Sequence, residues 1–291
     1  MSLRDFQQVI RDAVKYFAQN GYTSESALDT WAQRIEAAAT GALISPTEAS
    51  ERIARHLSSV YQRATRKLPP HLAKLQAVTA RRMGPEMYFR RIQSLPQLAN
   101  IMRNELDRRI AASADLIKIR REESLAATLR RFRGWASSVP PGGTPTPPAK
   151  QTNLLLKDFR KVRYETNRLN TDQGHKLNSS LNATFALGTG AIAGIWHSNW
   201  RQRNYNYRED HKERDLNIYT IRGNWALEQG LMKPSKAGYT DEITQPAEEV
   251  YCRCYYEYIY NLDALPAVML TKKGQAALAA LDEVELAAAA E

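Results

Sequence analysis

A proline-rich stretch near the middle of the chain limits what this protein can fold into. Residues 137–149 read SSVPPGGTPTPPA, with five prolines and two glycines in thirteen residues. Such a run cannot form a helix or a central strand, because proline lacks the amide donor and fixes its φ angle. Its prolines stiffen the backbone toward an extended spacer. The sequence therefore predicts two halves, residues 1–136 and 151–270, joined by a linker at residues 137–150 and followed by an Ala/Glu-rich tail at residues 271–291.

The first half has the apolar spacing of helices. A first buried stripe steps by three and four residues through Phe6, Ile10, Val14 and Phe17. The sequence SPTE at residues 45–48 is a capping box with proline at the first helical position, so another helix is expected to start there. These patterns predict a mainly helical N-terminal domain.

One predicted helix of this half is unusually long. Pro96 is expected to open it, and no Gly or Pro interrupts residues 97–133. At 1.5 Å per residue such a helix is about 55 Å long. A helix of this length suggests an extended arm or a spine packed against partners.

The positive charge of the chain is concentrated in the first half. Residues 1–150 carry 24 Lys and Arg against 13 Asp and Glu, a net charge of +11, whereas the remaining residues carry 17 against 18, a net of −1. This excess favours a polyanionic partner such as DNA, or an acidic protein surface. A solvated, arginine-rich helical surface explains the same excess without a partner.

The densest cations lie near the end of the long predicted helix. Arginines with an aromatic neighbour can neutralise phosphates and stack on bases, which makes them candidate DNA-binding residues. The alternative is a helix C-terminus whose cations complement the macrodipole and whose stop is Gly134. The candidate DNA-binding residues are Arg120, Arg121, Arg130, Arg131, Arg133 and Trp135.

The second half mixes helical and extended patterns, so the fold class expected for the chain is α+β. Residues 154–169 and 172–187 read as two helices, and GTGAIAG at residues 188–194 reads as a turn into a strand. Residues 250–260 are almost all β-branched, aromatic or Cys, which predicts a strand that carries Cys252-Arg253-Cys254. Parallel side chains two residues apart on a strand do not favour a disulfide.

The residue pattern of this second half resembles a known family. A Trp, R-x-x-H, a glycine, a proline and then C-R-C followed by aromatic residues is similar to the C-terminal domain of the phage Mu F-like minor head proteins, the head-morphogenesis family. The pattern departs from the family at Asn206, Pro246 and Tyr251, where Asp, a proline pair and Asn are usual. The residues that carry the resemblance are Trp200, Asn206, Arg208, His211, Gly223, Pro246, Cys252, Arg253 and Cys254.

The resemblance implies a non-enzymatic minor structural protein of a tailed bacteriophage head, acting near the portal in prohead assembly. It implies the portal and/or major capsid protein as partners, double-stranded DNA as a further partner, multiple copies per virion, and no membrane in the assembled head. Its expected locations are the head interior or portal region of the virion and, during assembly, the host cytoplasm. The alternative is a metal-dependent nuclease or DNA-processing enzyme that uses the His211, Cys252 and Cys254 region.

The same three side chains are the candidate metal ligands. Two thiolates and an imidazole suit zinc, and Asp210, His197 or water could supply a fourth ligand. The competing interpretation has no cofactor: the two Cys side chains pack as small apolar groups, and the polar residues of R-x-x-H form buried links.

The N-terminus and the longest apolar stretch bear on localisation. MSLRDFQQ lacks the apolar core of a signal peptide, and residues 185–196 are too short to span a bilayer. We therefore expect a soluble protein of a reducing cytoplasm, in which the two cysteines stay thiols or metal ligands.

Overall fold

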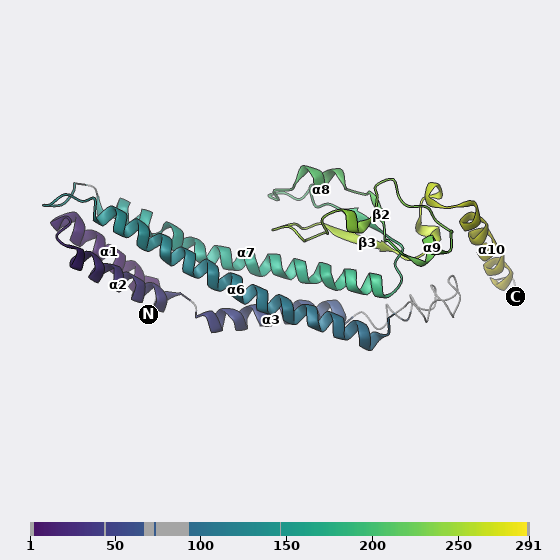
Figure 1. The fold of residues 1–291 in the computed structure, drawn as a ribbon, viewed down its shortest axis with the longest axis horizontal. Coiled ribbons are helices and arrows are strands. Elements are labelled where there is room, and N and C mark those ends of the chain that lie inside the picture. The colour runs from purple at the N-terminus through teal and green to yellow at the C-terminus, as the bar shows by residue number, and fades with distance from the viewer. Residues whose placement is uncertain (1–2, 44, 67–72, 74–92, 146, 290–291) are drawn as a thin grey trace. The chain divides into compact units, whose positions relative to one another are not determined.

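The computed structural model describes residues 3–43, 45–66, 73, 93–145 and 147–289, and it is mostly helical with one small antiparallel sheet (Figure 1). This confirms the α+β layout. The described chain forms two compact units: residues 1–57 with 108–171, and residues 58–107 with 172–291. No helix in the described ranges is long and apolar enough to cross a bilayer.

The first unit contains the predicted amphipathic helices. Helix α1 spans Leu3–Asn20, α2 spans Glu25–Ala42 and α3 begins in this unit and spans Pro46–Thr65. The serine cap of the predicted capping box is present at the start of α3, where the amide of Glu48 donates to Ser45 Oγ at 3.1 Å, while the carboxylate of Glu48 pairs with Arg52 at 2.7 Å. The apolar stripe predicted for α1 is buried, with Phe6, Ile10, Val14 and Phe17 fully inside the core.

Two long helices pass from one unit into the other along the chain. Helix α6 spans Leu95–Ala136, so the long helix predicted from Pro96 is confirmed, three residues longer at its end than the uninterrupted run (Figure 1). Helix α7 spans Pro148–Gly188 and replaces the two shorter helices that the sequence suggested. No proline separates those two predicted segments, so one backbone hydrogen-bond ladder runs through both.

The proline-rich residues between α6 and α7 form a turn rather than an extended spacer. Val139 is buried and accepts a hydrogen bond from the amide of Tyr22 at 3.0 Å, and the amide of Thr144 donates to the carbonyl of Ala18 at 2.9 Å. Gly21 takes φ +73°, and a Cβ there would lie 2.0 Å from the carbonyl oxygen of Pro140. The turn is therefore part of the first unit and covers the end of α1.

The core of the first unit joins four helices. Side chains from α1 and α2 meet the end of α6 and the start of α7. The aromatic rings of Phe6 and Phe159 have centroids 4.0 Å apart, and those of Phe17 and Phe132 lie 5.7 Å apart.

The second unit is organised around a three-stranded sheet with the order β2-β1-β3, in which both pairings are antiparallel. Its strands are β1 (Ala193–His197), β2 (Ile218–Thr220) and β3 (Tyr255–Ile259). A turn at residues 188–192 leads into β1, as the sequence predicted. The remaining elements are α8 (Glu209–Glu213), α9 (Trp225–Glu228), η1 (Thr240–Glu242), η2 (Leu262–Ala264), η3 (Ala267–Met269) and α10 (Lys272–Ala289).

The strand expected over residues 250–260 was too long, and it does not carry the C-R-C sequence. Strand β3 begins only at Tyr255, because Tyr251 takes φ +62° and the amide of Cys252 donates to the carbonyl of Glu249 at 3.1 Å. Cys252 and Cys254 therefore lie on the turn that leads into the strand. Both side chains are nevertheless buried, and they pack with Tyr256 and Trp196.

Candidate metal centre

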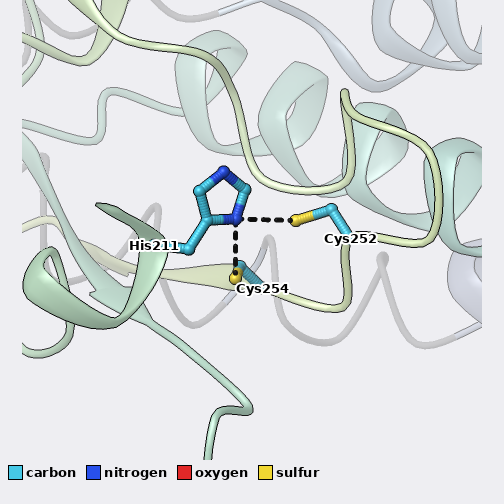
Figure 2. Close-up of side chains that lie close together, drawn as sticks. All are labelled: His211, Cys252 and Cys254. Atoms are coloured by element: carbon cyan, nitrogen blue, oxygen red, sulfur yellow. Dashed lines mark hydrogen bonds between the residues drawn. The ribbon is translucent and has the colours of Figure 1, made fainter. Parts of the chain in front are cut away.

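Three side chains from two separate segments converge in the second unit. His211 lies on α8, and Cys252 and Cys254 lie on the turn before β3, about forty residues later. His211 Nδ1 is 3.5 Å from Sγ of Cys252 and 3.5 Å from Sγ of Cys254. Figure 2 shows this nitrogen turned toward both sulfur atoms while the other ring nitrogen points away from them. The three ligand atoms all lie within 4.8 Å of one another.

These separations fit a tetrahedral zinc site. With Zn–N near 2.1 Å and Zn–S near 2.3 Å, nitrogen and sulfur ligands of a tetrahedral ion are about 3.5 Å apart. Both cysteines are free thiols, as expected from the argument against a disulfide, and all three side chains are buried. The residues present therefore fit a zinc ion, which would be held by Nδ1 of His211 and the two sulfur atoms.

Neither of the two residues proposed as a fourth ligand, His197 and Asp210, reaches the thiols. His197 bonds Glu257 at 2.9 Å and stacks on Tyr255 at the outer end of β1, so it does not join the group. Asp210 lies 3.8 Å from Nε2 of His211, on the ring nitrogen that points away from the thiols, and it bonds Arg214. Among the described residues the group therefore offers three protein ligands, which leaves a small molecule such as water for a fourth position.

A carboxylate that the sequence did not single out lies behind the imidazole. Nε2 of His211 is 2.8 Å from Oε2 of Glu249, and Nε of Arg208 is 3.0 Å from the same oxygen. The contact with His211 is a close approach rather than a well-directed hydrogen bond, because neither buried atom has a hydrogen-bond partner among the described residues. Arg208 also donates to the carbonyl of Val250 at 3.0 Å. The R-x-x-H pattern thus joins a metal-ligand candidate to an arginine that holds its carboxylate partner.

Helix α7 anchors the turn that carries the thiols. The amide of Tyr251 donates to Oδ1 of Asp172 at 2.7 Å, and Oγ of Ser179 donates to the carbonyl of Pro246 at 2.7 Å. Asp172 is itself buried and pairs with Lys176 at 3.4 Å. These bonds fix the backbone on both sides of Glu249, so the loop that presents the thiols is held by side chains on one helix.

The other residues of the sequence pattern have separate local roles in the second unit. Nε1 of Trp200 donates to Asp215 at 2.9 Å, and the guanidinium of Arg253 lies 5.3 Å from the ring centroid of Tyr205. The backbone of Arg253 is fixed at both ends, since its amide donates to the hydroxyl of Tyr205 and its carbonyl accepts from Asn199. Gly223 takes φ +66° in the turn between β2 and α9. Asn206 is exposed and lies on the loop before α8.

The two thiols share a proton unequally. A hydrogen bond from the Cys254 thiol lowers the pKa of Cys252 to about 5, against the opposing effect of burial. Backbone amides of Cys254 and Ala247 and the charge of His211 act in the same direction. The same thiol–thiol hydrogen bond, together with burial, raises the pKa of Cys254. Cysteine binds a metal as the thiolate, so zinc would meet one anionic sulfur at this site and would displace the proton of the other thiol on binding.

The candidate DNA-binding residues all lie on α6, but several are engaged in the first unit. Arg120 pairs with Glu123 at 2.9 Å, and Arg133 pairs with Asp29 at 2.6 Å. Arg121 donates to the carbonyl of Thr40 at 3.0 Å. Trp135 is half-buried against Phe17, Arg130 and Arg131 are exposed, and ten residues of helix, about 15 Å, separate Arg120 from Arg130.

Comparison of the chain with protein-family models, with curated proteins and with solved structures found no match in any of the three.

Proposed function

We propose that this chain is a minor structural protein of a tailed-phage head that acts near the portal in head assembly, and that zinc stabilises its second unit. The observation that carries the proposal is the buried group of His211, Cys252 and Cys254 backed by Glu249 and Arg208. Six residues of the head-protein pattern belong to this group or to the turn that carries it. They are Arg208, His211, Pro246, Cys252, Arg253 and Cys254.

Burial favours a structural role for the metal. The side chain of His211 is 1% exposed, and Cys252 and Cys254 are 1% and 4% exposed. Three protein ligands and a water are the usual set of a catalytic zinc site, but a hydrolytic site must also present its metal to a phosphodiester, and the burial of this group works against that access. The metal-dependent nuclease therefore has less support in this geometry than the assembly protein. Zinc here would replace part of the apolar core that a small sheet cannot supply.

The partners of this proposal are the portal and/or major capsid protein, with duplex DNA as a further contact of the first half. The exposed Tyr255 and Val250 near the thiol-bearing turn are apolar residues of the kind that protein interfaces bury. The basic first half can face either DNA or an acidic inner shell.

The proposal is tested by asking where the chain resides. DNA-free proheads and DNA-filled heads of the same phage are purified, and the chain is quantified in both by mass spectrometry against the portal protein. Recruitment by head proteins predicts the same ratio of chain to portal in both particles. A chain absent from DNA-free proheads would instead be one that enters with the genome.

The enzymatic alternative is tested separately. The purified chain is incubated with supercoiled plasmid and Mg²⁺, Mn²⁺ or Zn²⁺, alongside the His211→Ala variant. The assembly role predicts no cleavage by either protein. Cleavage that depends on metal and disappears in His211→Ala would support the nuclease and contradict the proposal.

A further inference from the structure

The loop between β1 and α8 has an unusual composition. Residues 198–208 read SNWRQRNYNYR, with three arginines, three aromatic residues, three asparagines and one glutamine. They contain no Asp or Glu, although residues 151–291 as a whole carry a net charge of −1. Positive charge, aromatic rings and side-chain amides are therefore concentrated in one short segment of the second unit.

Hydrogen bonds fix this loop at several points. The side-chain amide of Asn199 donates to the carbonyl of Arg253 at 2.6 Å, and the hydroxyl of Tyr205 accepts from the amide of Arg253 at 3.1 Å. Nε1 of Trp200 donates to Asp215 at 2.9 Å. A ligand that binds the loop therefore meets side chains on an ordered backbone, which lowers the entropy cost of binding.

Two guanidinium groups at this loop are arranged on aromatic rings. The guanidinium carbon of Arg201 lies 4.5 Å from the ring centroid of Trp200, and that of Arg253 lies 5.3 Å from the ring centroid of Tyr205. Nη1 of Arg253 also donates to Oε1 of Gln202 at 3.0 Å. An arginine held in this way can bind a phosphate through its remaining N–H groups or take a base against its planar face.

Arg203 is a cation that is available to a ligand. Its side chain is exposed, and it makes no hydrogen bond, ion pair or ring contact within the part of the chain that the structure describes. Arg208, in contrast, is committed to Glu249 at 3.0 Å. Arg201 is also exposed and lies two residues before Arg203, so the Cα atoms of the two arginines are at most about 7 Å apart. Two exposed cations this close together suit a polyanion.

The acidic residues of the adjoining helix α8 leave these cations available. Glu209 pairs with Lys212 at 3.2 Å, and Asp210 pairs with Arg214 at 2.8 Å. Glu213 is exposed at the end of α8 that is farther along the chain from the loop. Two of the three carboxylates of this helix therefore already have cationic partners on the same element or next to it.

These features favour a single-stranded nucleic acid over other polyanions. Unpaired bases offer flat faces to aromatic rings and arginine planes, and their edges offer donors and acceptors to side-chain amides. A duplex hides those faces and is read by a helix or a two-stranded ribbon in its groove, and this loop is neither. An acidic peptide would pair with the cations but offers no bases to the rings and amides.

We propose that residues 198–208 bind single-stranded nucleic acid. Arg201 and Arg203 pair with its phosphates, while bases lie against the exposed parts of the aromatic rings and of the guanidinium of Arg253. This loop is a different part of the chain from the candidate DNA-binding residues of α6. The inference rests neither on the zinc site nor on the proposed head role.

The test titrates the full-length chain with a labelled oligodeoxythymidylate of about 12 nucleotides, measured by fluorescence anisotropy. The combined change Arg201→Ala and Arg203→Ala should weaken binding about tenfold or more. It should also reduce the slope of log affinity against log salt by about 1.4, since each phosphate contact of a single strand contributes about 0.7. Arg253 is left unchanged because it lies between the two candidate metal ligands Cys252 and Cys254.

The matched control removes two exposed cations of the same unit that lie outside the loop. The combined change Lys233→Ala and Lys236→Ala should leave the affinity and the slope unchanged. Circular dichroism verifies that each variant is folded. An oligouridylate of the same length is titrated in parallel, and tighter binding of one of the two strands identifies DNA or RNA as the source of the ligand.

Ultraviolet cross-linking of the wild-type chain to the oligodeoxythymidylate provides a second measurement. Mass spectrometry should place thymine cross-links within residues 198–208. Cross-links confined to α6, or equal affinity of the loop variant and the wild type, would overturn the proposal. A labelled polyglutamate peptide is the competing ligand: if the loop variant loses binding of the peptide but not of either oligonucleotide, the loop contacts an acidic protein and the proposed ligand is wrong.

Discussion

Nε2 of His211 lies 2.8 Å from Oε2 of Glu249, on the side of the imidazole opposite the two thiols. Metal-bound histidines commonly hold a carboxylate at the nitrogen that does not bind the metal, because it fixes the tautomer and the orientation of the ring. Nε of Arg208 lies 3.0 Å from the same carboxylate oxygen. Glu249 and Arg208 thus hold the imidazole so that its Nδ1 faces the sulfur atoms, although neither residue contacts the thiols.

Removing this carboxylate should weaken metal binding. Glu249→Ala is expected to lower the affinity for zinc about 10- to 100-fold, measured by competition with a chromophoric chelator. Glu257→Ala is the matched control, since Glu257 contacts His197 at 2.9 Å in a pair that lies outside the thiol group. Equal affinities of the two variants would show that Glu249 does not orient the ligand.

The thiols should be needed for both metal and stability. Wild-type protein purified without chelators is expected to contain about one zinc per chain by elemental analysis, and Cys252→Ser or Cys254→Ser to contain almost none. Chelation should lower the thermal midpoint of the wild type and leave that of each variant unchanged. Wild-type protein that carries no stoichiometric metal would favour the interpretation in which both cysteines pack as small apolar side chains.

The sequence predicted the local parts of this centre but not its supports. R-x-x-H and C-R-C are unusual residue types at fixed spacing, so His211, Cys252 and Cys254 could be named together. Glu249 and Asp172 were missed because their roles depend on contacts between distant segments: Asp172 binds a backbone amide 79 residues further along the chain. Acidic residues three positions before a cysteine are common, so only the folded loop distinguishes Glu249.

Two glycines in contrasting environments give a test of the first unit. Gly21→Ala should destabilise the protein by at least about 2 kcal/mol, because φ is +73° and the added Cβ would overlap the carbonyl oxygen of Pro140. Gly134→Ala should stabilise it by about 0.5–1 kcal/mol, since that Cβ meets open space on a helix. Urea unfolding of each variant measures both changes in the free energy of unfolding. Similar changes for the two substitutions would contradict the close packing of Gly21 against the proline-rich turn.

Alkaline pH should destabilise the second unit through its tyrosines. Burial raises the pKa values of Tyr256 and Tyr258, and it raises the pKa of Tyr260 to about 12. An unfolded tyrosine ionises near pH 10, so the unfolded chain loses protons first and the free energy of unfolding falls as pH rises above about 10. As pH is raised, the absorbance of tyrosinate from these three residues should increase only at the pH at which the second unit unfolds. Tyr255→Phe, which alters an exposed ring of the same strand, is the control and should leave that coupling intact.

The basic first half should bind duplex DNA without sequence preference. Log affinity is expected to fall linearly with log salt concentration, and the exposed Arg130→Ala change should reduce the slope by about one. Lys236→Gln, an exposed cation of the second unit, should not alter the slope. Fluorescence anisotropy with a labelled duplex measures both, and absence of binding at low salt would contradict a role in contacting the genome.

The fold was predictable where a local sequence pattern is enough to define an element. Apolar spacing predicted α1, the capping sequence predicted the start of α3, and the absence of Gly and Pro predicted the length of α6. The two helices predicted at residues 154–169 and 172–187 form the single helix α7. Asn170 and Thr171 are weak helix formers, but their low propensity does not interrupt the backbone hydrogen bonds of this helix. The strand at residues 250–260 was overestimated because residue types report β propensity but not the left-handed backbone at Tyr251.

The turn of prolines between α6 and α7 also determines what a protease could do to this protein. A cut between Gly142 and Gly143 would leave two polypeptides, yet Phe6 would still meet Phe159 across the core of the first unit. The two pieces should therefore migrate as one particle under native conditions and separate only in denaturant. Neither piece would carry a complete unit, so expressing the chain as halves divided at this turn would yield partners that need each other to fold.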